Sequence, residues 1–214
     1  MIGELRAQII DAHARRPTIR DGGTFWYALD VPARLEFEHV IQHLRGLVPG
    51  GPEFIGAEWW FRASTTDTGF PFHFDRDEGI RRAIVSPDLA SILYLSTAGG
   101  PTVILDATPT RTAAPRAAIG VHPRPGRFAM FPGTLLHGVL PGPPARWPRV
   151  TLLVNWWRSV PRMECATPPR SLGRRRVDAK RAATRAAALA SIDPARLLSK
   201  AAWRELIAKQ ATYR

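Results

Sequence analysis

The sequence contains almost no cysteine and no long hydrophobic run. Its single cysteine, Cys165, excludes an internal disulfide and suits a reducing compartment. No apolar stretch approaches the roughly 18 residues that a membrane-spanning helix needs. The N-terminus carries Glu4 and Arg6 where a secretory signal would be apolar. We therefore expect a cytoplasmic protein that neither crosses nor enters a membrane.

Lysine is also scarce, with three lysines among 30 basic residues. Residues 1–160 hold 17 arginines against 14 acidic residues, whereas residues 161–214 hold 13 basic against 4 acidic residues. The formal net charge of +12 is thus concentrated in the C-terminal segment. Two interpretations stay open: the arginine usage of a GC-rich genome, or an electrostatic surface for an acidic partner.

The composition, 45% hydrophobic and 22% charged over 214 residues, is that of one sizeable core with extensions. We expect one domain over residues 1–160 and a basic, helical C-terminal extension over residues 161–214. Alanine and arginine dominate residues 174–190, and Asp193-Pro194 is typical of the start of a last helix. Such helices would cover a sheet edge, mediate homo-oligomerisation or meet an acidic partner.

Within residues 1–160, helical periodicity occurs only in the N-terminal part. Apolar residues recur at helical spacing over 2–14 and again between Asp30 and Pro49. From residue 53 on, short apolar stretches are separated by Gly, Pro, Asp and Thr, which is typical of a β-sandwich or barrel. The expected strands are 24–29, 54–62, 69–74, 81–85, 91–96, 102–105, 118–122, 127–131, 134–140 and 150–157.

Two histidines and one aspartate form a candidate metal site. His73 and Asp75 stand two residues apart in a stretch expected to be extended, so both side chains point to the same face. A histidine and a carboxylate of this kind are two ligands of a facial triad that leaves coordination positions open. His137, on a later strand, is the expected third ligand. His122 is a weaker candidate because Pro123 and Pro125 interrupt its strand.

The strand over 150–157 carries a candidate anion site at its start. Alternation places Arg149, Thr151, Leu153 and Asn155 on one face. An arginine on a buried strand is costly unless an anion pairs with it, and a guanidinium suits a carboxylate. The carboxylate belongs either to a small molecule, with the hydroxyl of Thr151 as a further donor, or to an acidic side chain of the same chain.

These motifs resemble those of the non-haem iron(II) and 2-oxoglutarate-dependent oxygenases, in particular the prolyl-hydroxylase-like branch. The resemblance covers about residues 54–158. It rests on His73-x-Asp75, His137, Arg149-x-Thr151, Leu93-Tyr94-Leu95 and Gly99-Gly100-Pro101-Thr102 in the family's order. The chain departs from the family at Pro101, where an acidic residue is frequent, and at Arg149, where several prolyl hydroxylases have lysine.

The resemblance implies a double-stranded β-helix, or jelly roll, over residues 1–160 with flanking helices. It implies that His73, Asp75 and His137 hold Fe(II), that Arg149 and Thr151 bind the far carboxylate of 2-oxoglutarate, and that Tyr94 adds a hydrogen bond there. The implied reaction is hydroxylation of an unactivated C–H bond of a small-molecule or peptidyl substrate by dioxygen, with release of succinate and carbon dioxide.

The substrate is not readable from the motifs, although charge offers one hypothesis. An acidic substrate would suit a mouth enriched in arginine, the candidates being Arg76, Arg81, Arg82, Arg111 and Arg116.

Two alternatives come from other classes of protein. A cupin-like jelly roll would hold a metal at the same three residues without oxygenase activity. A nucleic-acid-binding protein would act through the basic tail, but no aromatic interleaving or recognised motif supports it. His39 and His43, four apart on the second helix, are not expected to bind metal because no Glu-x-x-His motif accompanies them.

Overall fold

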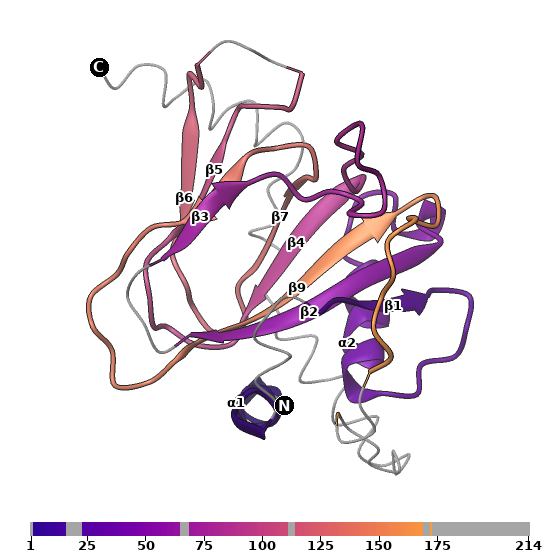
Figure 1. The fold of residues 1–214 in the computed structure, drawn as a ribbon. Coiled ribbons are helices and arrows are strands. Elements are labelled where there is room, and N and C mark those ends of the chain that lie inside the picture. Colours follow the sequence, from indigo (N-terminus) through magenta and orange to yellow (C-terminus); the bar gives the residue numbers. More distant parts are fainter. Residues whose placement is uncertain (1, 16–22, 65–68, 111–113, 169–171, 173–214) are drawn as a thin grey trace.

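The computed structural model describes residues 2–15, 23–64, 69–110, 114–168 and 172. Figure 1 shows its elements along the chain. They are α1 (Ile2–Arg15), β1 (Phe25–Ala28), α2 (Glu36–Arg45), the short 3-10 helix η2 (Gly51–Glu53), β2 (Gly56–Ser64), β3 (Phe70–His73), β4 (Leu89–Tyr94), β5 (Thr102–Leu105), β6 (Ala118–Val121), β7 (Phe128–Pro132), β8 (His137–Val139) and β9 (Arg149–Trp157).

The strands form two antiparallel sheets. The larger sheet has the order β1-β2-β9-β4-β7, and the smaller has the order β3-β8-β5-β6. Strand β9 is central, because all nine of its residues pair with β2 and six of them also pair with β4. The mainly β class with N-terminal helices is therefore confirmed, and the two sheets are consistent with a jelly roll. The helices expected over 174–190 and beyond residue 193 lie outside the described residues.

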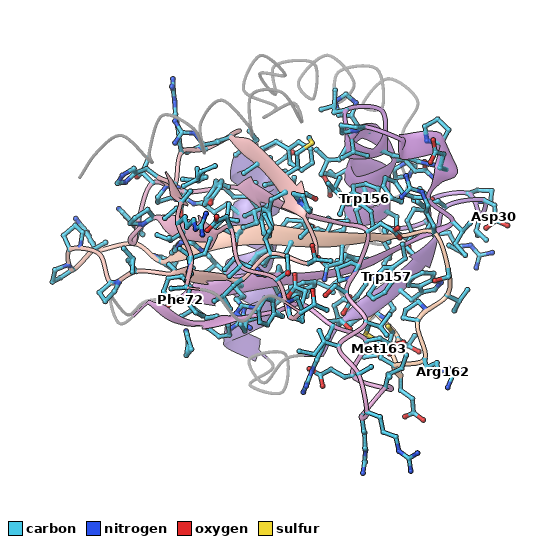
Figure 2. All side chains as sticks on the ribbon, turned by 90° about the horizontal axis from the view of Figure 1, so that it is seen from above. Asp30, Phe72, Trp156, Trp157, Arg162 and Met163 are labelled. Carbon is cyan, nitrogen blue, oxygen red and sulfur yellow. The ribbon has the colours of Figure 1, made fainter. Side chains whose placement is uncertain are left out.

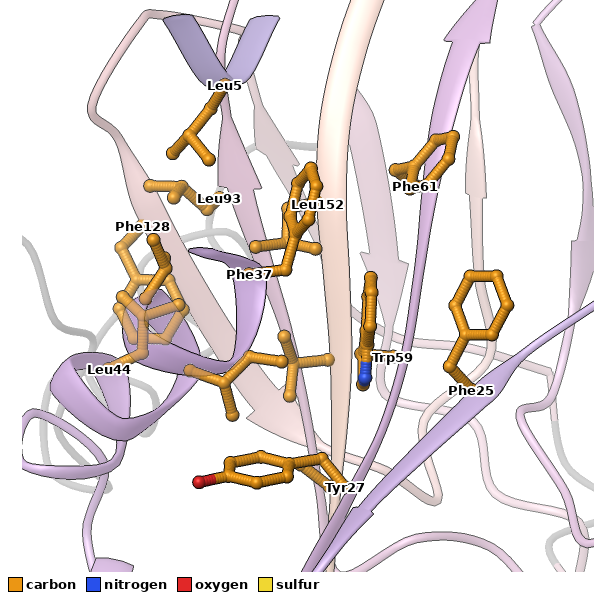
Figure 3. Packing of buried hydrophobic residues seen from close by; sticks show 14 of the residues in the cluster. Leu5, Phe25, Tyr27, Phe37, Leu44, Trp59, Phe61, Leu93, Phe128 and Leu152 are labelled. Atoms are coloured by element: carbon orange, nitrogen blue, oxygen red, sulfur yellow. The ribbon is translucent and has the colours of Figure 1, made fainter. Parts of the chain in front are cut away.

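Helices α1 and α2 cover the outer face of the larger sheet, away from the smaller sheet (Figure 1). The even-numbered residues of β9, from Val150 to Trp156, contribute to this core, as the alternation predicted. Figure 3 shows its centre, where the Phe37 ring of α2 stacks on the Trp59 indole with ring centroids 5.4 Å apart. Burial of these large aromatic side chains is the main stabilising contribution on this face.

The opposite face of the larger sheet looks toward the smaller sheet. Successive β9 residues alternate between the two faces, so that Trp156 and Trp157 lie on opposite sides of the strand (Figure 2). A second, smaller apolar cluster lies between the sheets. It is formed by Ala90, Ile92, Tyr94, Ile104, Ile119, Ala129 and Phe131. The space left beside this cluster contains the candidate site.

One expected strand is absent. Residues 81–85 form no strand; they lie in an exposed loop, where the N–H of Asp77 donates to the carbonyl of Val85 (2.7 Å). The expectation failed because local apolar residues such as Ile84 and Val85 do not reveal whether a partner strand is available. The strand expected over 102–105 occurs as predicted, and the remaining expected strands occur with shifted ends.

The segment after β9 returns to the sheet. Ala166 forms a parallel bridge with Phe25 of β1, and its N–H donates to the carbonyl of Thr24 (2.8 Å). Leu172 is buried in the core under the helices. Among the described residues, no helix is both long and apolar enough to cross a membrane.

Candidate metal centre and anion pocket

The smaller sheet places two histidines opposite each other. Strand β3 pairs with β8 so that His73 and His137 are direct Cα partners, and their ring centroids lie 4.4 Å apart. His73 is the last residue of β3, and Asp75 follows where the chain leaves the strand. Two strands distant in sequence thus bring three candidate ligands to one point.

The carboxylate of Asp75 lies between the two imidazoles. Its Oδ1 is 3.5 Å from Nε2 of His73, and its Oδ2 is 3.6 Å from Nε2 of His137. The ligand atoms of the three residues all lie within 4.8 Å of one another. Ligand atoms about 2 Å from one ion and at right angles to each other are about 3 Å apart, so a small contraction would bring all three onto a metal ion.

The backbone fixes which imidazole nitrogen faces the centre. Nδ1 of His73 is 3.0 Å from the carbonyl of Pro71, and Nδ1 of His137 is 3.0 Å from the carbonyl of Leu135. A carbonyl only accepts hydrogen bonds, so each Nδ1 carries the hydrogen and donates it. In the neutral imidazole the lone pair is then on Nε2, the nitrogen nearer to Asp75, which is the tautomer that a metal requires; when the ring is protonated, Nε2 donates to Asp75 instead.

Burial and charge set the protonation of the three residues. Burial raises the pKa of Asp75, but the hydrogen bond from His73 and the charges of both histidines outweigh it and lower the pKa overall. Burial lowers the pKa of His137, and for this residue burial prevails. Burial also lowers the pKa of His73, but its interactions with Asp75 and the Pro71 carbonyl raise it overall. The deprotonated carboxylate is therefore favoured.

Solvent reaches the three ligands from one side. The His73 side chain is 37% exposed, whereas those of Asp75 and His137 are 10% and 7% exposed. His73 therefore marks the open side of the centre. This asymmetry is expected of a site at which two ligands are fixed inside the protein and a substrate approaches past the third.

A cavity of about 120 Å³ extends from His73 and His137 to Arg149 and Thr151 on β9. Arg149 is largely buried, and burial lowers the pKa of its guanidinium. Its Nη2 donates to Oγ1 of Thr102 (2.9 Å), and its Cζ lies 5.4 Å from the centre of the Tyr94 ring. Among the described residues, no carboxylate forms an ion pair with it. The alternative of an acidic side-chain partner for Arg149 is therefore not observed among these residues.

Two buried polar atoms in this pocket have no hydrogen-bond partner among the described residues. They are Nε of Arg149 and Oγ1 of Thr151. Leaving such atoms unpaired costs about 1–3 kcal/mol each. A carboxylate bound between them would accept from both, so these residues fit the far end of a keto diacid.

Tyr94 reaches the pocket through another residue. Its hydroxyl donates to Oγ1 of Thr102 (2.8 Å) and lies 3.4 Å from the carbonyl of Val121. Oγ1 of Thr102 thus accepts from both Tyr94 and Arg149, which leaves its own hydrogen free to be donated into the cavity. Sequence reasoning quoted Thr102 in the Gly-Gly turn motif but did not identify it as a site residue.

The Gly99-Gly100 turn lies directly against Arg149. Gly99 has φ of +87°, and a Cβ there would stand 2.6 Å from Cδ of Arg149. A Cβ on Gly100 would stand 2.0 Å from the carbonyl oxygen of Leu140. The two glycines therefore allow the turn and the 140–142 loop to close over the arginine, a close approach that no other residue permits.

The neighbouring strand contributes two charged residues that sequence reasoning missed. Arg62 lines the cavity, and Glu58, on the same face, accepts from Nδ2 of Asn155 (3.3 Å). Burial raises the pKa of Glu58 to about 7. Alternation along β2 separates both from the apolar face of Trp59 and Phe61, but a charged face usually points to solvent. Only the pairing of β2 with β9 shows that this face lines the cavity.

Other sequence candidates lie away from the centre. His122 and His39 are exposed and His43 is half-buried, and none of them joins a group of metal-binding side chains in the part of the chain that the structure describes. The exposed arginines proposed for the mouth do not line the cavity. They are Arg76, Arg81, Arg82 and Arg116. Arg111 lies outside the described residues.

No protein-family model matches the chain, and no curated protein matches it either. Solved structures similar to it include a prolyl-4-hydroxylase from Pseudomonas putida, with 20% identity and a TM-score of 0.45. The match covers 74% of this chain and 83% of that chain. HygX from Streptomyces hygroscopicus, solved with nickel and 2-oxoglutarate bound, has 14% identity and a TM-score of 0.39 over 72% of this chain and 78% of that chain.

An oxidoreductase of the 2OG-Fe(II) oxygenase family from Burkholderia pseudomallei has 13% identity and a TM-score of 0.38, over 78% of this chain and 95% of that chain. Of these three structures, one is named as a 2OG-Fe(II) oxygenase and one was solved with 2-oxoglutarate bound. The identities and TM-scores are too low for the role of any residue to be carried over from them.

Proposed function

We propose that this chain is an iron(II)- and 2-oxoglutarate-dependent oxygenase with a double-stranded β-helix core. The observation that carries the proposal is one cavity with a His-Asp-His group at one end and, at the other, a largely buried arginine that pairs with no carboxylate of the described residues. A metal alone would explain only the first end. A metal chelated by a keto diacid explains both, because the far carboxylate of that acid reaches the arginine.

Each residue of the centre has a distinct task in this proposal. Nε2 of His73, Nε2 of His137 and the carboxylate of Asp75 would hold the metal, and three protein ligands of this kind leave coordination positions open for other ligands. The Pro71 and Leu135 carbonyls keep both imidazoles in the required tautomer. When bound, iron(II) with 2-oxoglutarate and dioxygen supplies the oxidising power for hydroxylating an unactivated C–H bond, with succinate and carbon dioxide as co-products.

The other end of the cavity binds and orients 2-oxoglutarate. Arg149 and Thr151 would donate to its far carboxylate through the two atoms that have no partner among the described residues. Thr102 adds a third donor, and Tyr94 acts on the carboxylate through Thr102. The cavity walls exclude water from these hydrogen bonds, which strengthens them.

We propose a small-molecule or peptidyl substrate, hydroxylation as the outcome, and a division into a 1–160 oxygenase domain and a 161–214 extension. In the described part of that extension, Ala166 forms a β-bridge with Phe25 of β1. A homo-oligomer through the C-terminal helices remains a proposal, since those residues lie outside the described ranges.

The proposal is tested by anaerobic titration of the iron(II)-loaded protein with 2-oxoglutarate. Chelation by the keto acid gives a weak visible charge-transfer band, which we expect in the wild type. The band should be absent in Asp75→Ala, and in Arg149→Met it should appear only at a much higher concentration of 2-oxoglutarate. Iron binding without any band would contradict the proposal and favour the cupin-like alternative.

A further inference from the structure

A second arginine faces the same cavity. Arg62 lies on β2 opposite Thr151 of β9, so it belongs to the strand next to the one that carries Arg149. Its Cζ lies 4.0 Å from the centre of the Phe70 ring, and burial lowers its pKa, while the charge of Asp75 raises it and that of Arg149 lowers it. In the ranges that the structure describes, no carboxylate forms an ion pair with Arg62.

The acidic residues nearby have other partners. Asp75 is the central carboxylate of the metal group. Glu58 lies four residues from Arg62 along β2, about 13 Å away on an extended strand, and is hydrogen-bonded to Asn155. The guanidinium of Arg62 is thus a partly buried cation facing a cavity, an arrangement that is costly unless an anion pairs with it.

Charge counting at the loaded centre leaves one charge unbalanced. The charges of iron(II) and of the 2-oxoglutarate dianion cancel. The negative charge of Asp75 offsets one of the two arginines that line the cavity. One positive charge remains for a further ligand, which matches a monoanionic carboxylate better than a phosphate dianion.

Although Arg62 pairs with Thr151 along the backbone, its guanidinium lies over Phe70 of β3. It stacks on Phe70, whose ring centre is 5.0 Å from that of His73, the solvent-exposed ligand. Arg149, by contrast, is held by Thr102 and Tyr94. Arg62 therefore lies on the open side of the centre, where a substrate would enter.

The cavity wall near Arg62 is largely apolar. Trp60 lies two positions before it on the same strand face, and Ile92 and Leu153 also line the cavity. An apolar body would pack against these side chains while its charged end meets the guanidinium.

We propose that Arg62 binds the carboxylate of the substrate, and that the substrate is a small carboxylic acid with an apolar body. This inference rests on the proposed function, because it assigns the second arginine only once 2-oxoglutarate occupies the first. Arg62 would then select anionic substrates, and the Phe70 ring would orient the guanidinium of Arg62.

The test uses phenylacetate and its neutral analogue phenylacetamide as probes. Each is titrated calorimetrically into the full chain loaded with Mn(II) and 2-oxoglutarate, since manganese prevents turnover. We expect the wild type to bind phenylacetate at least tenfold more tightly than the amide, as a charge-assisted hydrogen bond provides about 10- to 100-fold. Arg62→Met should abolish this preference, and Arg62→Lys should restore part of it.

The same titrations distinguish the failures. If Arg62→Met weakens 2-oxoglutarate binding tenfold and leaves the preference for phenylacetate unchanged, Arg62 belongs to the co-substrate end and the inference is overturned while the oxygenase proposal stands. If the wild type shows no preference for phenylacetate, the inference is also overturned. If the wild type binds no 2-oxoglutarate, the oxygenase proposal itself fails.

Asp67 provides a control. It is the first acidic residue after Arg62 in the sequence and lies outside the described residues. Asp67→Asn should bind phenylacetate within about threefold of the wild type. A tenfold gain in affinity would show that Asp67 already neutralises Arg62 and would overturn the inference.

Discussion

His73 and His137 are direct partners across β3 and β8, with their ring centroids 4.4 Å apart, although 63 residues separate them in the sequence. Strand pairing alone therefore positions two of the three ligands. Asp75 joins them because it follows β3 immediately, with its two oxygens directed at the two imidazoles.

The first prediction concerns metal affinity. Replacing His137 or Asp75 by alanine should lower the affinity for Mn(II) by at least 100-fold, because each change removes a ligand from a three-ligand site. His73→Ala should act similarly. Isothermal titration of metal into the chelator-treated protein measures this.

The exposed His122→Ala variant is the matched control and should bind metal as the wild type does. Equal losses in the His122 and His137 variants would show that the measured metal does not occupy the centre.

The second prediction separates the two ends of the cavity. Arg149→Met should weaken 2-oxoglutarate binding by about 10- to 100-fold, since a charge-assisted hydrogen bond is lost, and should leave Mn(II) binding nearly unchanged. Thr151→Val should weaken 2-oxoglutarate by about 3- to 10-fold through the loss of one donor. Arg124→Met, at an exposed position, is the control. Loss of metal binding in the Arg149 variant would refute this separation.

The third prediction concerns the turn that covers Arg149. Gly99→Ala places a Cβ 2.6 Å from Cδ of Arg149 at a backbone φ of +87°, so it should destabilise the fold by about 1–3 kcal/mol and weaken 2-oxoglutarate binding. Gly120→Ala is a suitable control, because a Cβ there meets only Cβ of Pro101 at 3.9 Å. Urea unfolding of both variants decides the matter, and equal stability losses would count against a specific role for Gly99.

The fourth prediction concerns pH and Glu58. Burial raises its pKa from 4.5 to about 7, so the folded protein holds this proton more tightly than the unfolded chain does. The contribution of Glu58 to stability should therefore be greatest below pH 4.5 and should fall by about 3 kcal/mol as the pH rises through 7.

Glu58→Gln removes this titration and keeps an acceptor for Asn155. In chelator-treated protein, it should be more stable than the wild type at pH 8 and similar at pH 5, as measured by urea unfolding at both values. The exposed Glu78→Gln variant should follow the wild type within about 0.5 kcal/mol. A stability gain for Glu58→Gln that is equal at both pH values would show that the effect does not come from the carboxyl proton.

Much of the architecture follows from local patterns. On β9, the alternation of Val150, Leu152 and Val154 against Arg149 and Thr151 predicted both faces, because one face is entirely apolar and the other is not. The sequence also placed His73 and Asp75 together, since residues two positions apart on an extended chain point to the same face.

Other features depend on contacts distant in sequence. On β2, the face that carries Glu58 and Arg62 reads as solvent-exposed from its charges, and only pairing with β9, about 90 residues later, turns it toward the cavity. The role of Thr102 depends on the approach of Tyr94 and Arg149 from the other sheet. Local sequence carries no record of such partners, which is also why residues 81–85 were wrongly predicted to be a strand.

The most direct test of the account is a crystal structure of the protein with Mn(II) and 2-oxoglutarate, grown without dioxygen. We expect the metal bound by Nε2 of His73, the carboxylate of Asp75 and Nε2 of His137, and the far carboxylate of 2-oxoglutarate bound by Arg149 and Thr151. A metal held elsewhere, or a 2-oxoglutarate molecule that makes no contact with Arg149, would contradict the account.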